Sequence, residues 1–214
     1  MSWRVAALMG GQGISFRGEE QSAIAKQPLE GQVAVHTLGL DGDTQVDKVH
    51  HGGPDMAVHH YPFDHHSFWR EEIGEHELLG RRGAFGSNLS ATGLTEDEVL
   101  LGDRFRLGSA LLEACQPRQP CWKIEHRFGR KGMVAKILAT GRSGWFYRVI
   151  ETGEAKSGDM LERTRRGDPE WSMRRMFETL WGTSSPVDKA QMARLAGHDL
   201  LPAKLREKTL KRIG

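Results

Sequence analysis

The chain has 214 residues and a formal net charge of +2, with 30 Lys and Arg against 28 Asp and Glu. This length can bury one core with a small appendage, and no apolar stretch approaches the ~20 residues that span a bilayer, so we expect no membrane association. Two cysteines are too few for a disulfide framework or for a four-thiolate iron–sulfur cluster. We therefore expect a cytoplasmic protein that receives any electrons from elsewhere.

Short apolar runs broken by Gly and Asp turns extend from Trp3 to about Arg166. This pattern is typical of a strand-rich domain with tight connections. The first run, residues 1–9, has no signal-peptide cleavage pattern and predicts a strand. Turns are expected at 107–109, 152–154 and 157–159. Further strands are expected at 33–38, 56–61, 83–90, 104–107, 110–116, 145–151 and 159–163.

Apolar residues at helical spacing predict helices at 63–73 and 132–140, packed on a barrel. Asp168-Pro169 and Ser185-Pro186 each place a capping residue before a proline, which predicts two more helix starts, and a third helix is expected from near Pro202. We therefore divide this mainly β (α+β) chain into a barrel domain, 1–166, and a three-helix unit, 167–214. A unit this small has marginal stability by itself. We therefore expect it to dock on the barrel or on another subunit, as in a homodimer.

The strongest chemical signal is Cys121, in the run QPRQPCWK at residues 116–123. Two prolines fix the backbone around the thiol, while Arg118 and Lys123 favour the thiolate, the form that acts as a nucleophile or as a soft metal ligand. A lone cysteine is more often a small buried apolar residue. We expect that structural role for Cys115, on the strand that leads to this loop.

Two other runs offer groups that could bind a ligand. In DKVHHGGPD, residues 47–55, Lys48 and two histidines precede Gly52 and Gly53, whose backbone could approach a ligand closely and leave amides free for an oxyanion. In GSNLSATGL, residues 86–94, Asn88 and nearby hydroxyls could contact the edge of a heterocycle. Either run taken alone is also compatible with an ordinary turn.

The three runs and their order along the chain resemble the MOSC domain, the family named after the C-terminal domain of molybdenum cofactor sulfurase. Within that family, the resemblance is to the small bacterial YiiM-like branch. The resemblance covers nearly the whole chain, including the helical tail. Its most specific part is the pairing of QPRQPCWK with HHGGPD. The sequence departs from the family at Ser87, where an acidic residue often precedes the asparagine.

The resemblance implies a MOSC-type β-barrel with peripheral helices that binds molybdenum cofactor, with Cys121 as the protein ligand to molybdenum. A histidine is the expected proton donor near neutral pH, and the sequence does not single out one of them. The place of His51 in the motif makes it an expected catalytic residue beside Cys121. The residues expected to contact the phosphate and the pterin are Lys48, Gly52, Gly53, Asn88, Arg118 and Lys123.

Similar proteins reduce N-hydroxylated compounds, including N-hydroxylated purine bases, to the parent amine or amidine with release of water. We therefore expect a molybdenum-dependent reductase in which the metal does the chemistry and the side chains orient the substrate and supply protons. Its expected partners are a small N-hydroxylated substrate and a separate electron-donor reductase.

Two other functions remain open. The histidine pairs at 50–51, 59–60 and 65–66, with Asp55 or Asp64, could hold zinc for hydrolysis. Their spacing argues against this, because adjacent residues on a strand point to opposite faces and ligands on a helix prefer spacings of three or four. The second alternative is a non-catalytic carrier of molybdenum cofactor, or of persulfide sulfur on Cys121. A sulfur carrier needs an exposed thiol, whereas a reductase needs a pocket beside the metal.

The basic run from Lys204 to Arg212 has apolar residues at helical spacing and no aromatic residue for stacking. This favours a packed helix with a solvated basic face over nucleic-acid binding. The same face could instead dock an electron-donating flavoprotein.

Overall fold

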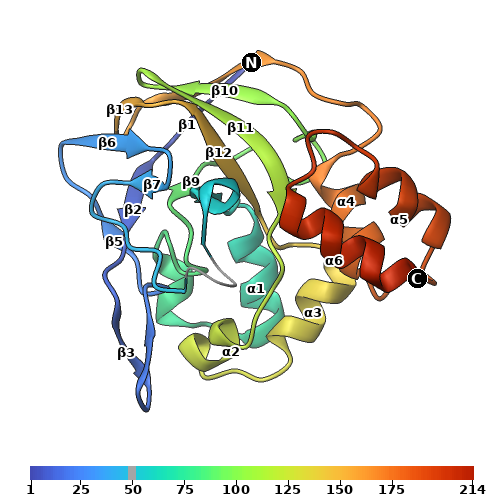
Figure 1. The fold of residues 1–214 in the computed structure, drawn as a ribbon. Helices are drawn as coiled ribbons and strands as arrows, with labels where there is room; N and C mark the ends of the chain where they lie inside the picture. The colour runs from blue at the N-terminus through green and yellow to red at the C-terminus, as the bar shows by residue number, and fades with distance from the viewer. Residues whose placement is uncertain (48–51) are drawn as a thin grey trace.

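The computed structural model describes residues 1–47 and 52–214 of the chain. The fold is mixed α+β, as the sequence predicts: a large sheet curls into a half-barrel, three helices from the middle of the chain lie along one end of it, and three C-terminal helices gather at its side (Figure 1). Within the described ranges, no helix combines the length and the apolar composition needed to cross a membrane.

The main sheet consists of the strands β1 (Ser2–Arg4), β2 (Ala7–Gly10), β5 (Gln27–Pro28), β8 (Val58–His60), β9 (Leu89–Ser90), β10 (Arg104–Leu107), β11 (Ala110–Pro117), β12 (Trp145–Glu151) and β14 (Met160–Arg165). Their order across the sheet is β1-β14-β10-β11-β12-β8-β9-β2-β5. Neighbours pair antiparallel except β8 and β9, which are parallel with His60 opposite Leu89. The fully buried β11 and its partner β12 therefore form the middle of the sheet.

Two small sheets lie beside the main one. One is formed by β6 (Gln32–His36), β7 (Gly39–Leu40) and β13 (Gly153–Lys156). The other is the hairpin of β3 (Ile14–Arg17) and β4 (Glu20–Ser22), which projects from the body of the molecule (Figure 1).

Two predictions about strands are wrong. Of the segment 83–90 only Leu89 and Ser90 are in a strand, because Gly83 and Gly86 take positive φ and turn the chain. The predicted turn at 152–154 instead begins strand β13, which pairs with β6.

The predicted helices at 63–73 and 132–140 correspond to α1 (His65–Ile73) and α3 (Met133–Thr140), whereas α2 (Lys123–Phe128) was not predicted. The C-terminal helices are α4 (Met173–Trp181), α5 (Lys189–Ala196) and α6 (Ala203–Ile213). Both α4 and α5 begin later than the prolines predict, because Ser172 and Asp188 are their capping residues and accept hydrogen bonds from the backbone N–H of Arg175 and Gln191. Single turns of 3₁₀-helix occur as η1 (Pro54–Met56) and η2 (Glu77–Gly80).

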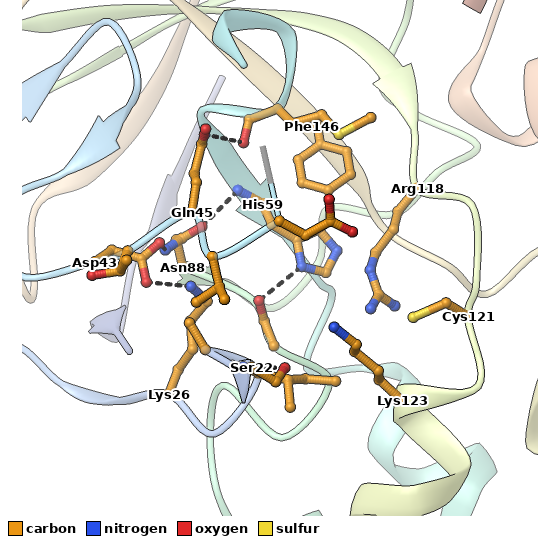
Figure 2. A pocket seen from close by; sticks show the side chains of 17 residues that line it. Ser22, Lys26, Asp43, Gln45, His59, Asn88, Arg118, Cys121, Lys123 and Phe146 are labelled. Carbon is orange, nitrogen blue, oxygen red and sulfur yellow. Dashed lines mark hydrogen bonds and ion pairs between the residues drawn. The ribbon is translucent and has the colours of Figure 1, made fainter. Parts of the chain in front are cut away.

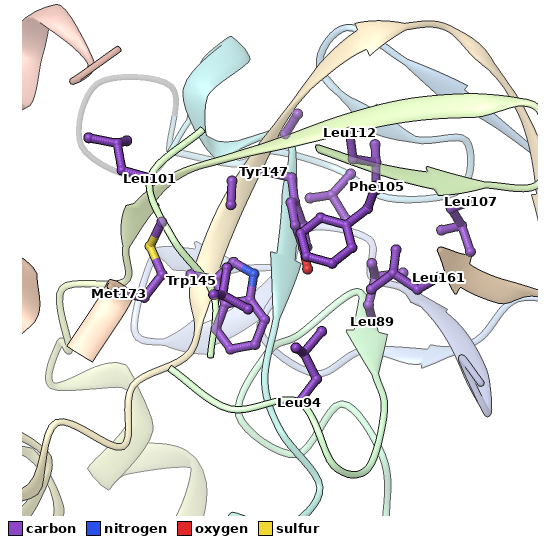
Figure 3. Packing of buried hydrophobic residues seen from close by; sticks show 14 of the residues in the cluster. Leu89, Leu94, Leu101, Phe105, Leu107, Leu112, Trp145, Tyr147, Leu161 and Met173 are labelled. Carbon is purple, nitrogen blue, oxygen red and sulfur yellow. The ribbon is translucent and has the colours of Figure 1, made fainter. Parts of the chain in front are cut away.

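One hydrophobic cluster joins the sheet to the C-terminal helices. It includes Phe105, Trp145 and Tyr147 of the sheet (Figure 3), and also Met173 of α4 and Leu205 of α6. Because burial of apolar surface drives such packing, the tail helices share the core of the half-barrel. The division into two domains near residue 166 stays a prediction.

A buried carboxylate, Glu96, holds the turn that precedes β12. Its Oε1 accepts hydrogen bonds from the backbone N–H groups of Ser143 (3.0 Å) and Gly144 (2.7 Å), and its Oε2 lies 2.7 Å from Nε2 of His65. Burial alone would raise the pKa of Glu96, but the hydrogen bond and charge of His65 and the Gly144 amide outweigh it, and the net pKa is lowered. This turn also holds the backbone of Arg118. The backbone N–H of Arg118 donates to the Gly144 carbonyl at 3.0 Å, and its backbone carbonyl accepts from the Ser143 hydroxyl.

We expect Gly108→Ala to be more destabilising than Gly18→Ala. Both glycines have φ of +57°, and this left-handed conformation costs an L-residue about 1–2 kcal/mol. A Cβ at Gly108 would lie 2.1 Å from the Glu154 carbonyl oxygen, whereas a Cβ at Gly18 would meet nothing within 4 Å. Overpacking should therefore lower the free energy of unfolding by about 2 kcal/mol more at position 108, measured by urea denaturation. Equal losses at the two positions would contradict the packing of this hairpin against β13.

We expect Glu96→Gln to lower the free energy of unfolding at pH 7 by about 3 kcal/mol, because the buried charge network loses its carboxylate. The matched control is Asp97→Asn, which removes a carboxylate that is 62% exposed and should cost less than about 1 kcal/mol. Since the pKa of Glu96 is lowered from its ordinary value of 4.5, its contribution is complete above that value and is lost as the pH falls through the folded-state pKa. The gap between wild type and Glu96→Gln should therefore narrow in acid; a gap that is constant from pH 7 to pH 3 would refute this assignment.

Candidate functional site

An open cleft lies between the Cys121 loop, strand β8 and the end of the β3–β4 hairpin. In Figure 2, Arg118, Cys121 and Lys123 lie on one side of the cleft. The opposite side carries Lys26, Asp43 and Asn88, which are linked to one another by hydrogen bonds. The cleft thus brings together residues from six separate segments of the chain.

Cys121 lies in the loop between β11 and α2 and is a free, partly exposed thiol. Its carbonyl accepts the backbone N–H of Ile124 at 3.2 Å, so α2 begins directly from the loop and sets its course. Lys123, the first residue of α2, has its Nζ 3.5 Å from Glu20 of the hairpin. The other cysteine, Cys115, is fully buried as expected, and burial raises its pKa to about 12, which leaves Cys121 as the reactive thiol.

Arg118 supplies a partly buried cation beside this thiol. Burial lowers the pKa of the guanidinium, and the charge of Cys121 acts in the opposite direction, which places the two groups within electrostatic reach. Its Nη1 atom is buried and has no hydrogen-bond partner among the described residues. Because an unsatisfied buried donor is costly, such an atom is well suited to an anionic ligand.

The opposite wall is built around an ion pair between Lys26 and Asp43, whose side chains are each 8% exposed. Burial lowers the pKa of Lys26, and the charge of Asp43 opposes the shift. Asp43 also accepts hydrogen bonds from the Gly11 amide (2.8 Å) and from Nδ2 of Asn88 (2.7 Å). This wall is therefore internally neutralised, and the cationic character of the cleft comes from the Cys121 side.

Asn88 lines the cleft as predicted, but its amide group is fully engaged within the protein. The two amide hydrogens are donated to the Met9 carbonyl (3.0 Å) and to Asp43, and the amide oxygen accepts the backbone N–H of His59 at 2.9 Å. Asn88 thus joins β2 to β8 and has no amide hydrogen left for a heterocycle. We expect it to position its neighbours.

His59 is a cleft residue that the sequence interpretation set aside among the histidine pairs. Its ring lies 5.0 Å from that of Phe146, and its Nδ1 lies 3.2 Å from the Gly86 carbonyl. A carbonyl can only accept, so Nδ1 carries the proton in this hydrogen bond. Burial, with Arg118 as the second cause, lowers the pKa of His59 well below its ordinary value, so the ring is neutral at pH 7. The alternation of faces along β8 was the available signal, because it places His59 and His60 in different surroundings.

The remaining predicted residues are placed differently. Lys48 and His51 lie outside the described residues. Gly52 and Gly53 line a neighbouring cavity. The prediction of a free amide at Gly53 is wrong, because its N–H donates to Oε1 of Gln45 at 2.8 Å.

A zinc site finds no support in the described part of the chain, where no group of three or more His, Cys, Asp or Glu side chains is placed to hold a metal ion. The described histidines of the pairs have structural partners instead. His60 lies 3.2 Å from the Tyr147 hydroxyl, His66 lies 2.9 Å from the Leu79 carbonyl, and His65 is bound to Glu96.

Known proteins resemble this chain in sequence and in fold. A family model described as the MOSC domain matches residues 47–162. "Protein YiiM" of Escherichia coli (strain K12) is 43% identical over 145 residues, which is 68% of this chain and 65% of that protein. "Uncharacterized protein YflK" of Bacillus subtilis (strain 168) is 42% identical over 161 residues, 73% of this chain and 70% of that protein.

Two further matches extend the comparison. The crystal structure of YiiM from Escherichia coli has a TM-score of 0.81 at 31% identity and covers 100% of this chain and 92% of its own. A protein named "Reductase" from Gibberella moniliformis is 39% identical over 73% of this chain, which spans only 28% of that longer protein. The family match, the relatives and the shared fold together show that the chain belongs to the MOSC domain family, in its YiiM-like group.

Proposed function

We propose that this protein is a molybdenum-cofactor-dependent reductase of N-hydroxylated compounds, with Cys121 as the protein ligand to molybdenum. The proposal depends on one observation: in an open cleft, the Cys121 thiol lies beside the buried Nη1 atom of Arg118, which has no hydrogen-bond partner among residues 1–47 and 52–214. A soft thiolate suits a high-valent metal held by a dithiolene, and a partly buried guanidinium suits the anionic groups that accompany it.

The residues of the cleft fit molybdenum cofactor in their donor chemistry. Arg118 offers a fixed fork of donors to an anion, and Lys123, whose Nζ is also 3.5 Å from Glu20, is a second cation at the start of α2. The Lys26–Asp43 pair leaves little net charge on the opposite wall. Lys48 and Gly52 are further proposed contacts, from their place in the DKVHHGGPD run.

The bound cofactor would supply the two-electron transfer by which an N–O bond is cleaved, so that two protons and two electrons convert the hydroxylamine to the amine and water. The side chains of the protein orient the substrate and supply protons. His59 is neutral, so it can orient a ligand but is a poor acid at pH 7. His51 is the proposed proton donor.

Membership of the MOSC family supports an association with molybdenum cofactor, and the relative named "Reductase" supports oxidoreductase chemistry. We propose that the electrons come from a separate reductase partner. Both cysteines are free thiols, which agrees with the proposed cytoplasmic residence.

We expect Cys121→Ser, produced in a host that makes molybdenum cofactor, to lose stoichiometric molybdenum. Turnover of an N-hydroxylated purine base with a chemical electron donor should fall by more than about a hundredfold, because the metal loses its protein ligand. Metal analysis, pterin fluorescence and the rate of amine formation measure the outcome.

The matched control is Cys115→Ala, which removes the buried thiol and should leave molybdenum content and turnover close to those of the wild type. Wild-type protein with cofactor but without turnover would favour the carrier function, in which Cys121 delivers cofactor or persulfide sulfur to another enzyme. Equal molybdenum content in Cys121→Ser and wild type would remove Cys121 as the ligand.

A further inference from the structure

A second, larger cavity adjoins the cleft. It has a volume of about 440 Å³ and is lined by residues of α6, of the end of β11 and of the start of β12. Met56, Arg118 and Phe146 line both hollows, so the second cavity begins where the cleft ends. A volume of this size is typical of small-molecule sites.

The α6 side of this cavity is basic. Lys204, Lys208 and Lys211 project from exposed positions of the helix, and none of the three forms an ion pair with a carboxylate within residues 1–47 and 52–214. Of the acidic lining residues, Asp55 is paired with Arg148 at 2.9 Å, which leaves Glu207 to offset the three lysines. Together with Arg118, the lysines give the cavity a net positive charge.

The cavity also has apolar lining residues, several of which present flat rings. Phe146 and Pro117 come from the barrel, and Trp181 and Leu205 come from the tail helices. Aromatic and proline faces of this kind pack well against a planar ring or a sugar. A ligand that fills the cavity would therefore combine a flat, partly apolar body with an anionic end.

We propose that this cavity binds the phosphate monoester of an N-hydroxylated nucleotide, with the phosphate at the α6 lysines and the base directed through the shared boundary at Arg118 and Phe146 toward Cys121. This inference rests on the proposed function and narrows its substrate class from N-hydroxylated bases to their 5′-monophosphates. It also gives the C-terminal helices a function, because α6 supplies the basic wall of the substrate site.

The test compares wild type with the double variant Lys204→Gln/Lys208→Gln, using cofactor-loaded protein and a chemical electron donor. The substrates are N6-hydroxyadenosine 5′-monophosphate and N6-hydroxyadenosine, which differ only in the phosphate. Wild type should prefer the monophosphate in kcat/KM by about tenfold or more, because charge-assisted contacts to phosphate are strong, and the preference should weaken with added salt. The double variant should lose this preference, mainly through KM, and keep its rate on the nucleoside.

A binding measurement separates this inference from the proposed function. Calorimetric titration with adenosine monophosphate and with adenosine requires no turnover, and the monophosphate should bind wild type at least about tenfold more tightly than it binds the double variant. The matched control is Lys131→Gln/Lys156→Gln, which removes two exposed lysines that line neither cavity and should leave both measurements unchanged.

Three results would overturn the inference and leave the reductase function intact. The first is an equal rate on nucleoside and monophosphate in wild type. The second is loss of pterin from the double variant, which would assign the lysines to the phosphate of the cofactor. The third is a double variant that keeps the wild-type preference for the monophosphate and turns over more slowly than wild type only when a protein replaces the chemical electron donor. This result would assign α6 to docking of the electron donor. The proposed function itself would be refuted if wild type from a host that makes molybdenum cofactor bound no molybdenum and did not turn over the free N-hydroxylated base.

Discussion

The carboxylate of Glu96 organises the geometry on which the cleft depends. It joins α1, through His65, to the turn at Ser143 and Gly144, and this turn holds both backbone groups of Arg118. Three neighbours in one low-dielectric site hold the carboxylate in its charged form. The position of the Cys121 loop is thus set by a charge buried on the far side of the turn, because a loop rich in proline has few backbone hydrogen bonds of its own.

The two walls of the cleft differ in how their charges are balanced. On one wall Lys26, Asp43 and Asn88 satisfy each other, so this wall is a rigid framework that needs no ligand. On the other wall Arg118 keeps a buried Nη1 without a partner in the described part of the chain. Such a group lowers the stability of the ligand-free protein and favours the ligand-bound form, which is how a binding site is expected to differ from structural packing.

The local patterns of the sequence predicted the elements that depend on neighbouring residues. Alternation predicts the strands at 104–107 and 145–151, and helical spacing with a closing glycine predicts α3. One short run, QPRQPCWK, is enough to place Cys121 and Arg118 close together. Residues that act through distant partners were missed. Lys26 carries no local signal, since its role depends on Asp43, and Gly53 loses its free amide only because Gln45 folds back onto it. Helices α4 and α5 begin a few residues after the positions that the prolines predict, because the side chains of Ser172 and Asp188 cap them there.

Arg118 lines both the cleft and the cavity under α6, and this sharing has a thermodynamic consequence. A guanidinium is planar and rigid, so an anion that takes one edge of the fork fixes the direction of the other. Ligands bound as proposed in the two hollows would therefore affect each other's affinity, and linkage requires that the effect be equal in both directions. The sign and size of this coupling are then set by one side chain, and they are the same whichever hollow is filled first.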